Sequence, residues 1–529
     1  MTMPHRERTG CPSAFATVRY RWRNARGLKF TATVLLIMGV CACGSTVAQG
    51  PLVPGSQGAM GVSGTVGSGV GGSGGGSLGS ATGATSLQRG QSGSAGPGAV
   101  TSASGGGPGS TSLSGSGSAA DAGTARGVTA AAITVGIPLP SDTTAVANAL
   151  GIKGAGTVPP QDMVAAVIND INRSGGVLGR KLVDSEHSYS IATYTSNPAQ
   201  TDAEICSDYR DDHKVFSIIF NVVDDYLRQC AAAMGSPFVI ANGNQAYLPA
   251  ADYQANGGNF LFGPTAITAE RLAHLFVQSL MARSFTRSWN ILSGGPGATP
   301  SRLGVIHVDT PDQDAYYADI GKELARYGLK FTDTFTYSRD LNDAVSGTQS
   351  AVLKFKADGI THVFGASAVF MDDAESQKYY PRYAYLPGLG ALGAQNVPAD
   401  EMNGALTVGW APAIDVAAQQ DPGDTPGARH CRAVMTKAGL SVSNRSDLET
   451  MYSICDALYM FRAALDAGGS PTAHALQTGF ESLGTSFPTA LSFNAHLGPA
   501  RHYGIDSVRD VAWDSNCGCL KYTSRTNRS

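Results

Sequence analysis

One unit of strand, loop, helix and strand, spanning Ile133–Leu182, constrains the fold of this chain more than any other feature. Its first piece, ITVGIPLP, is a short apolar run with β-branched residues, bounded by prolines, which is typical of a buried strand. A helix is predicted to begin at Pro159-Pro160, because the N–H that proline lacks would be unpaired there anyway. Apolar residues then recur at helical spacing until Gly175-Gly176 supplies a left-handed stop. This order favours a parallel sheet with the connecting loop at its carboxyl edge.

Strand and helix patterns alternate from there to the end of the chain. Apolar runs such as KVFSIIFNVV (214–223) and SRLGVIHVD (301–309) are typical of strands buried on both faces. Amphipathic helices separate such runs, among them ITAERLAHLFVQSLMARSF (267–285). The pattern predicts an α/β fold, and residues 128–529 are long enough for two substantial lobes.

The sequence ITVGI…INRSGGVLGRKL resembles the opening of type I periplasmic solute-binding proteins, the leucine/isoleucine/valine-binding group of ABC-importer receptors for amino acid transport. The resemblance extends from about Ile133 to Lys521. Within it, SRLGVIHVD resembles the first strand of the second lobe, and MYSICDALYMFRAAL (451–465) resembles the helix that returns to the first. The resemblance implies two Rossmann-like lobes with parallel sheets, joined by a three-strand hinge. Lobe 1 would comprise about 128–262 and 400–483, and lobe 2 about 263–399 and 484–529.

The N-terminal segment has the pattern of a secretory signal. Basic residues between Arg19 and Lys29 precede the apolar run TATVLLIMGVCA, which is too short for a permanent membrane span. The run ends in VCACGS, which resembles a bacterial lipoprotein cleavage box. Residues 1–43 are therefore predicted to be a lipoprotein signal peptide with Cys43 as the lipidated residue. Cys41 is a competing choice, and an ordinary cleaved signal is the alternative.

Residues 44–127 are predicted to be a disordered Gly/Ser-rich linker. The segment contains 27 glycines in 84 residues and no aromatic residue, so it cannot bury enough apolar surface to offset its chain entropy. We interpret it as a tether; a segment that threads the cell wall or associates with itself is the functional alternative.

The charge balance excludes some partners. Beyond residue 43 the chain contains 31 basic and 40 acidic residues, which gives a net charge of −9. An acidic surface argues against nucleic acid, because neutralising phosphate dominates that affinity. Membrane contact is expected through the N-terminal lipid. The predicted location is extracytoplasmic, with the protein lipid-anchored to the bacterial cell membrane.

Six cysteines remain beyond the signal, an even number that suggests disulfides in an oxidising compartment. Sequential pairing is expected, although six cysteines can be joined in many ways. The expected pairs are Cys206 with Cys230, Cys431 with Cys455, and Cys517 with Cys519. The last would close a tight ring across one glycine. A metal site would need further ligands at suitable spacing, and none lies nearby, so no metal is predicted.

Motifs that could carry catalysis do not have the context that catalysis requires. Gly388–Gly393 matches G-x-G-x-x-G but lies late in the fold before a loop, so we interpret its glycines as turn or hinge residues. His307 and His362 lie in apolar runs and are expected to be core residues. Asp224-Asp225 and Asp372-Asp373 are interpreted as solvated helix N-termini. No catalytic residue and no cofactor is predicted.

The strand-end loops are the predicted ligand site. In open α/β sheets, ligands bind outside the carboxyl ends of the strands, and two lobes facing each other would place several such loops around one cleft. Short polar side chains suit hydrogen bonds to a small polar ligand, and two aromatic rings could stack on it. The predicted ligand-binding residues are Ser141, Asp142, Asn221, Asn242 and Asn244 from the first lobe, Asp309, Tyr316 and Ser367 from the second, and Trp410.

The chain departs from the amino-acid-binding members of this family where the amino acid would be held. In those members an acidic residue pairs with the ligand ammonium, and its position falls near Leu389 or Ala391 of this chain, where there is no carboxylate. Tyr316 keeps a similar aromatic position. An unpaired ammonium buried in a cleft is strongly disfavoured. A free α-amino acid is therefore not expected as ligand unless Asp309 or Asp372 replaces the missing acid.

The function expected from the resemblance is that of an extracytoplasmic receptor. It would capture a small polar metabolite between two lobes and present it to the membrane permease of an ABC importer, without catalysis. The alternative is an extracytoplasmic ligand sensor or surface-binding module with the same fold and no transporter.

Overall fold

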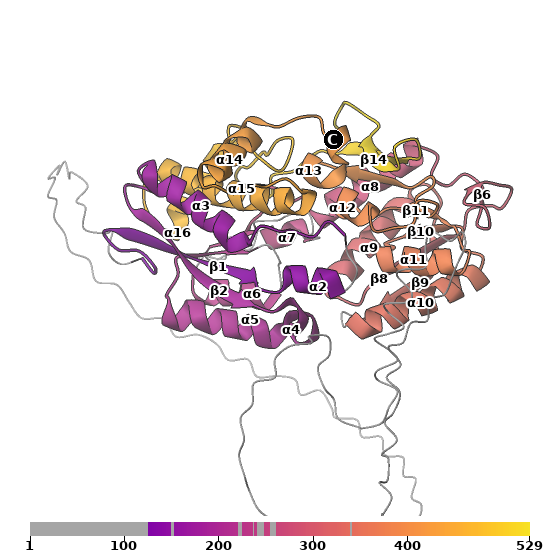
Figure 1. Ribbon diagram of the computed structural model, residues 1–529, viewed down its shortest axis with the longest axis horizontal. Helices are drawn as coiled ribbons and strands as arrows, with labels where there is room; N and C mark the ends of the chain where they lie inside the picture. The colour runs from indigo at the N-terminus through magenta and orange to yellow at the C-terminus, as the bar shows by residue number, and fades with distance from the viewer. Residues whose placement is uncertain are drawn as a thin grey trace, which may run out of the picture. The chain divides into compact units, whose positions relative to one another are not determined.

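Two β-sheets with helices packed against them make up the described part of the chain (Figure 1). The computed structural model describes residues 125–149, 153–220, 225–235, 237–240, 248–253, 261–338 and 341–529, all within one compact unit. The predicted signal peptide (1–43), the lipidation site Cys43 and the predicted linker up to residue 124 lie outside the described residues.

Ordered contacts begin slightly before residue 128, the predicted start of the folded part. Arg126 Nη2 donates a hydrogen bond to the Tyr209 carbonyl at 2.8 Å, and Thr134 N donates to the Gly127 carbonyl at 2.8 Å. The last two residues of the predicted linker are thus bonded to the first strand, through Gly127, and to a π-helical turn, through Arg126.

The first sheet is parallel throughout, in the order β2-β1-β3-β4-β5. Its strands are β1 (Ala132–Pro140), β2 (Lys181–Tyr189), β3 (Ser217–Phe220), β4 (Phe238–Ile240) and β5 (Leu261–Phe262).

The predicted opening unit is confirmed as β1, α3 (Pro160–Arg173) and β2. Gly176 ends the helix at φ +73°, and a Cβ there would lie 1.9 Å from the Arg180 carbonyl oxygen, so only glycine fits. Asn172 then pairs with the backbone of Leu182, accepting from its N–H at 2.7 Å and donating to its carbonyl at 2.8 Å. These contacts fix where β2 enters the sheet.

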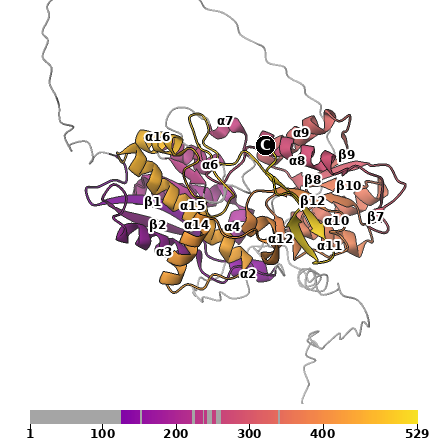
Figure 2. The same ribbon diagram turned by 90° about the horizontal axis from the view of Figure 1, so that it is seen from above.

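Helices cover both faces of this sheet, which explains why its strands are apolar on both sides. On one face α3, α14, α15 and α16 pack together, and α4, α5 and α6 lie on the other (Figures 1 and 2). The bounds are α14 (Pro426–Lys437), α15 (Arg445–Gly468), α16 (Ala473–Leu483), α4 (Ile191–Ser196), α5 (Pro198–Ser207) and α6 (Asp225–Ala233), with short helices α2 (Thr143–Ala149) and α7 (Ala250–Tyr253) and a π-helical turn at Asp208–Asp212.

The second sheet has the order β14-β13-β12-β11-β10-β8-β9. Its strands are β8 (Leu303–Val308), β9 (Phe331–Tyr337), β10 (His362–Phe364), β11 (Arg382–Ala384), β12 (Leu406–Gly409), β13 (Arg509–Asp514) and β14 (Cys519–Tyr522). The strands from β9 to β12 are parallel, whereas β13 and β14 add an antiparallel edge that the sequence analysis did not predict.

The helices of this second part are α8 (Ala269–Ala282), α9 (Pro311–Ala325), α10 (Leu341–Ala357) and α11 (Ala368–Ser376). In pairs, α8 packs with α9 and α10 with α11. Two short helices, α12 (Gly390–Ala394) and α13 (Pro412–Asp415), a 3₁₀ turn at Ala418–Gln420 and the small β6 (Trp289–Asn290) and β7 (Gly295–Pro296) ribbon complete the described elements. Within the G-x-G-x-x-G match, Gly390–Gly393 form most of α12, and the predicted loop follows this short helix from Gln395.

The chain passes between the two sheets three times, and the three passages are hydrogen-bonded to one another. Gly263 N donates to the His502 carbonyl at 2.8 Å, and Gly504 N donates back to Gly263 at 3.0 Å. Trp410 Nε1 donates to the Thr265 carbonyl at 3.0 Å. The predicted three-strand connection is thereby confirmed.

β12 forms part of the second sheet, although the predicted boundary near residue 400 would assign it to lobe 1. Ala384 of β11 pairs with Leu406, and Gly409 pairs with Arg509 of β13. Defined by its sheets, the chain makes its second passage after Gly409. The remaining lobe boundaries stay predictions.

All three predicted disulfides are present. Cys206 bonds to Cys230, Cys431 to Cys455, and Cys517 to Cys519. The first two tie α5 to α6 and α14 to α15, that is, one helix pair on each face of the first sheet.

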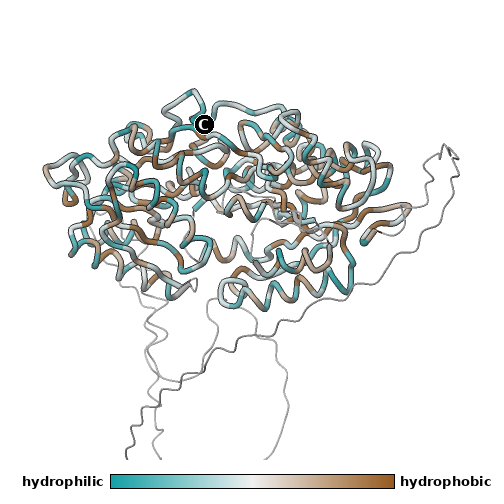
Figure 3. Tube along the Cα trace, turned by 180° about the vertical axis from the view of Figure 1, so that it is seen from behind, coloured by the Kyte–Doolittle hydropathy of each residue, from teal (hydrophilic) through white to brown (hydrophobic). Residues whose placement is uncertain are grey.

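The hydropathy pattern agrees with this layered arrangement. In Figure 3 the helices change between hydrophilic and hydrophobic colours along their length, as amphipathic helices on a sheet do. Among the described residues, no helix combines the length and apolar character that a membrane crossing requires.

Candidate functional site

The end of β1 is the first strand terminus where ligand-binding residues were predicted. Ser141 N and Oγ both donate to the Tyr189 carbonyl, at 2.8 and 3.0 Å. Asp142 accepts from Ser190 Oγ and from Ile191 N, each at 2.7 Å, so it holds the start of α4. Both predicted residues therefore shape the carboxyl edge of the sheet through contacts within the protein.

The loop between α2 and α3 is held on the neighbouring helix by one buried carboxylate. Asp447 in the first turn of α15 is 2% exposed and accepts from Thr157 N at 2.9 Å, Thr157 Oγ1 at 3.0 Å and Val158 N at 3.2 Å. This clamp fixes the start of α3 beside the start of α15, close to the end of β1.

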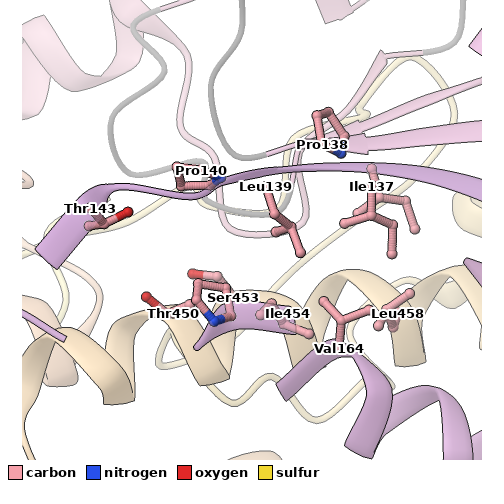
Figure 4. Close-up of a pocket in the computed structure, with 12 residues that line it drawn as sticks. Ile137, Pro138, Leu139, Pro140, Thr143, Val164, Thr450, Ser453, Ile454 and Leu458 are labelled. Atoms are coloured by element: carbon pink, nitrogen blue, oxygen red, sulfur yellow. The ribbon is translucent and has the colours of Figure 1, made fainter. Parts of the chain in front are cut away.

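A pocket with a cavity volume of about 130 Å³ lies between these elements (Figure 4). Side chains reach it from β1, α3 and α15; in the figure Ile137 and Leu139 project from the strand toward Val164, Ile454 and Leu458. Its twelve lining residues are Ile137, Pro138, Leu139, Pro140, Thr143, Pro160, Val164, Ile219, Thr450, Ser453, Ile454 and Leu458.

The pocket is apolar in its interior and polar at its mouth. Thr143 is exposed and Thr450 half-buried, whereas Ile137, Ile454 and Leu458 are buried. None of the lining side chains is charged. An enclosed apolar cavity of roughly 150 Å³ is large enough for benzene, so this pocket suits an aliphatic or ring group of similar size.

One buried hydroxyl lines the pocket. Ser453 is 3% exposed, and its Oγ has no hydrogen-bond partner among the described residues. An unpaired buried hydroxyl costs about 1–3 kcal/mol, which a polar atom of a bound molecule would recover. The sequence analysis missed Thr450 and Ser453. Their signal is the i, i+3 spacing of two small polar residues on an otherwise apolar helix face.

The predicted residues of the second part do not gather around this pocket. Asp309 is exposed at the end of β8, with its N–H bonded to the Tyr337 carbonyl at 2.8 Å. Ser367 Oγ caps α11 by accepting from Phe370 N at 3.2 Å. Tyr337, packed nearby, has its pKa raised by burial, and Ser367 partly opposes that shift.

Tyr316 and Trp410 are packed inside the protein, contrary to the expectation that their rings face a ligand. Tyr316 is fully buried on α9, with its ring 5.1 Å from that of Tyr317. Trp410 is 2% exposed, and its N–H is bonded to Thr265 in the connection between the sheets. Asn221, Asn242 and Asn244 lie outside the described residues, so their ligand role stays a prediction.

The acid pair Asp372-Asp373 corrects another expectation. The pair lies within α11, not at a solvated N-terminus. Burial raises the pKa of Asp373 to about 6, while a hydrogen bond from Thr348 Oγ1 at 3.1 Å opposes the shift. Burial also raises the pKa of Asp372.

The expectation for the two histidines in apolar runs is confirmed. His307 and His362 are 5% and 0% exposed. Burial, together with the charge of Arg382, lowers the pKa of His362 to about 3, so it is neutral in the folded protein. Among the described residues, no group of three or more histidine, cysteine or acidic side chains could hold a metal ion.

The fold is that of type I periplasmic binding proteins, as solved structures show. One similar structure is a branched-chain amino acid ABC transporter protein from Thermus thermophilus with bound valine (15% identity, 75% of this chain and 96% of that chain covered, TM-score 0.52). Another is an ABC transporter substrate-binding protein from Aeropyrum pernix (13% identity, 74% and 95% covered, TM-score 0.54). A third is a fatty acid ABC transporter substrate-binding protein from Thermomonospora curvata (12% identity, 76% and 93% covered, TM-score 0.52). No family model and no curated protein sequence matches the chain.

Proposed function

We propose that this protein is an extracytoplasmic, lipid-anchored receptor that binds a small solute and delivers it to the permease of an ABC importer, without catalysis of its own. The observation that supports this most directly is the pocket at the carboxyl edge of the first sheet, in a fold whose two sheets are joined by three adjacent passages. Ligands of open α/β sheets bind at that edge.

The lining of the pocket supports a solute with a small apolar group. Its interior is aliphatic, Ser453 supplies one buried hydroxyl, and the hydroxyls of Thr143 and Thr450 stand at the mouth. The polar part of the solute would lie outward, toward the strand-end loops. The similar structures from Thermus thermophilus and Thermomonospora curvata are named for valine and fatty acid, both of which carry aliphatic groups.

A free α-amino acid remains disfavoured as the ligand. Leu389 and Ala391, where the ammonium-pairing acid is expected, carry no carboxylate, and the pocket adds none. Short branched carboxylates, alcohols and amides are therefore the first compounds to test.

A thermal-shift screen of the purified chain against these compounds tests the binding role. A ligand at about 100 times its Kd adds about 2.7 kcal/mol to the free energy of unfolding, which raises the Tm by several degrees. Ser453→Leu fills the pocket and should abolish the shift. Ala467→Leu places the same side chain at an exposed position of α15 and should leave the shift intact. A shift of equal size in Ser453→Leu would place the ligand elsewhere.

The importer role needs a separate test. Genes for a permease and an ATPase beside this one, with loss of solute uptake on deletion, would support it. A ligand that binds the pocket in a cell where deletion leaves uptake unchanged would favour the sensor alternative.

A further inference from the structure

The hairpin of β13 and β14 carries a disulfide at its tip. Asp514 and Cys519 are the last paired residues of the hairpin, and Cys517 bonds to Cys519 across the single residue Gly518. Gly518 has φ +60°, a conformation that glycine adopts without strain. The bridge closes one turn and joins no two elements that the hairpin does not already join.

This bridge differs from the other two in its access to solvent. Cys517 is exposed and Cys519 half-buried. The other four cysteines are buried: Cys206 and Cys230 are each 5% exposed, Cys431 1% and Cys455 2%. Disulfide exchange requires a thiolate to approach a sulfur along the S–S axis, so access separates the three bridges into two classes.

The number of residues between the paired cysteines separates the three bridges into the same two classes. Each buried bridge joins cysteines 24 residues apart, whereas Cys517 and Cys519 are 2 apart. A bridge across a long loop constrains the unfolded chain, and by linkage the folded state stabilises that bridge to the same degree. The short ring constrains the unfolded chain least, so folding gives it the least protection against reduction.

The hairpin does not depend on this bridge. Its strands are paired from Val511↔Tyr522 to Trp513↔Leu520, and Leu520 is 1% exposed in the core of the second sheet. After reduction the Cys517 thiol has an acceptor in place, because its Sγ lies 3.5 Å from the Asp514 carbonyl oxygen.

We propose that Cys517–Cys519 is a thiol–disulfide exchange site that reacts with small extracytoplasmic thiols while the other two bridges stay closed. A thiolate attacks the exposed Cys517 Sγ and forms a mixed disulfide, and Cys519 leaves as a thiolate that takes up a proton. A second thiolate attacks the mixed disulfide, which releases the oxidised small molecule and frees Cys517 to be protonated. Two thiols are oxidised to one disulfide, and the protein gains two thiols.

Graded mixtures of reduced and oxidised glutathione test the proposal on the folded full-length chain. After acid quenching, alkylation and peptide mass spectrometry, the peptide with Cys517 and Cys519 should be half-reduced at a mixture at least about tenfold less reducing than either buried pair requires. A mixed disulfide with glutathione on Cys517 should appear at intermediate ratios. Reduction of all three bridges over one range, or resistance of this bridge until the chain unfolds, would overturn the proposal.

A kinetic experiment distinguishes an exchange site from a disulfide that is merely easy to reduce. Catalytic amounts of the oxidised chain should speed the oxidation of a reduced small dithiol by oxidised glutathione, and the double variant Cys517→Ala/Cys519→Ala should not. If that variant fails to fold, the selective reduction of the unaltered chain still decides the question, because its buried bridges are the internal control. No acceleration by the unaltered chain would contradict an exchange role.

Discussion

Asn396 and Lys153 are 243 residues apart in the chain, and the side-chain amide of the first pairs with the backbone of the second. Lys153 N donates to Asn396 Oδ1 at 2.7 Å, and Asn396 Nδ2 donates to the Lys153 carbonyl at 3.4 Å. Gln395 Nε2 adds a bond to that carbonyl at 3.0 Å. Asn396 follows α12, which packs on β14, whereas the loop after Lys153 is clamped to α15 by Asp447. The pairing thus joins a segment next to the second sheet to a loop held on a helix of the first.

Replacing Asn396 tests how much this pairing stabilises the loop around Lys153. Asn396→Ala removes the bonds to Lys153 and leaves the Gln395 bond, so the local free energy of opening should fall by about 1 kcal/mol. The Lys153 amide, whose acceptor is Asn396 Oδ1, should then exchange with deuterium about fivefold faster. Gln419→Ala, on an exposed residue, is the control. Unchanged exchange in Asn396→Ala would mean that contacts other than the Asn396 pairing keep the Lys153 amide protected.

The Asp447 clamp should matter more for global stability. Asp447→Ala leaves the donors of Thr157 and Val158 without their buried acceptor, at an expected cost of about 3 kcal/mol in the free energy of unfolding. Asp447→Asn keeps one acceptor oxygen and should cost less. Urea denaturation measures both. An equal loss in the two variants would indicate that charge, and not the number of acceptors, holds the loop.

Local patterns predicted what depends on local chemistry. The β1–α3–β2 unit follows from proline, apolar spacing and the Gly175-Gly176 stop, and the disulfides follow from cysteines on consecutive helices. Side-chain direction was not predictable in this way. An aromatic residue after a strand can contact a ligand or pack in the core, and the sequence does not distinguish the two. In the structure α9 packs against α8, and Tyr316 on α9 is buried. The contact of Lys153 with Asn396 leaves no pattern in either segment.

Replacing either of two buried serines, Ser453 or Ser279, by alanine should change the free energy of unfolding in opposite directions. Ser453 Oγ is buried without a hydrogen-bond partner among the described residues, so Ser453→Ala should raise the free energy of unfolding by about 1 kcal/mol. Ser279 Oγ donates to Asp510 at 2.6 Å and accepts from Arg283 at 2.6 Å, so Ser279→Ala should lower it by about 1–3 kcal/mol. Urea midpoints of the two variants give the signs. A loss of stability in Ser453→Ala would indicate that water or another group satisfies the hydroxyl.

The pH dependence of stability should contain a contribution from Glu401. Burial, with the charges of Glu375, Asp400 and Asp372 adding to it, raises the pKa of this carboxyl from 4.5 to about 9, although Tyr383 OH donates a hydrogen bond to it. Between those pH values the folded state keeps a proton that the unfolded state has lost. The folded state therefore binds more protons, and stability falls as the pH rises. The contribution is complete below about pH 4.5 and lost as the pH passes about 9.

Glu401→Gln should remove this part of the slope, because the amide stays neutral at every pH. The difference in the free energy of unfolding between the variant and the unaltered chain should shift in favour of the variant from about pH 5 to about pH 9. Urea midpoints at about pH 5, 7 and 9 measure it, with Asp212→Asn on an exposed residue as the control. Parallel pH profiles for Glu401→Gln and the unaltered chain would mean that Glu401 titrates alike in the folded and unfolded states, so that the effect of burial on its pKa is cancelled within the folded protein.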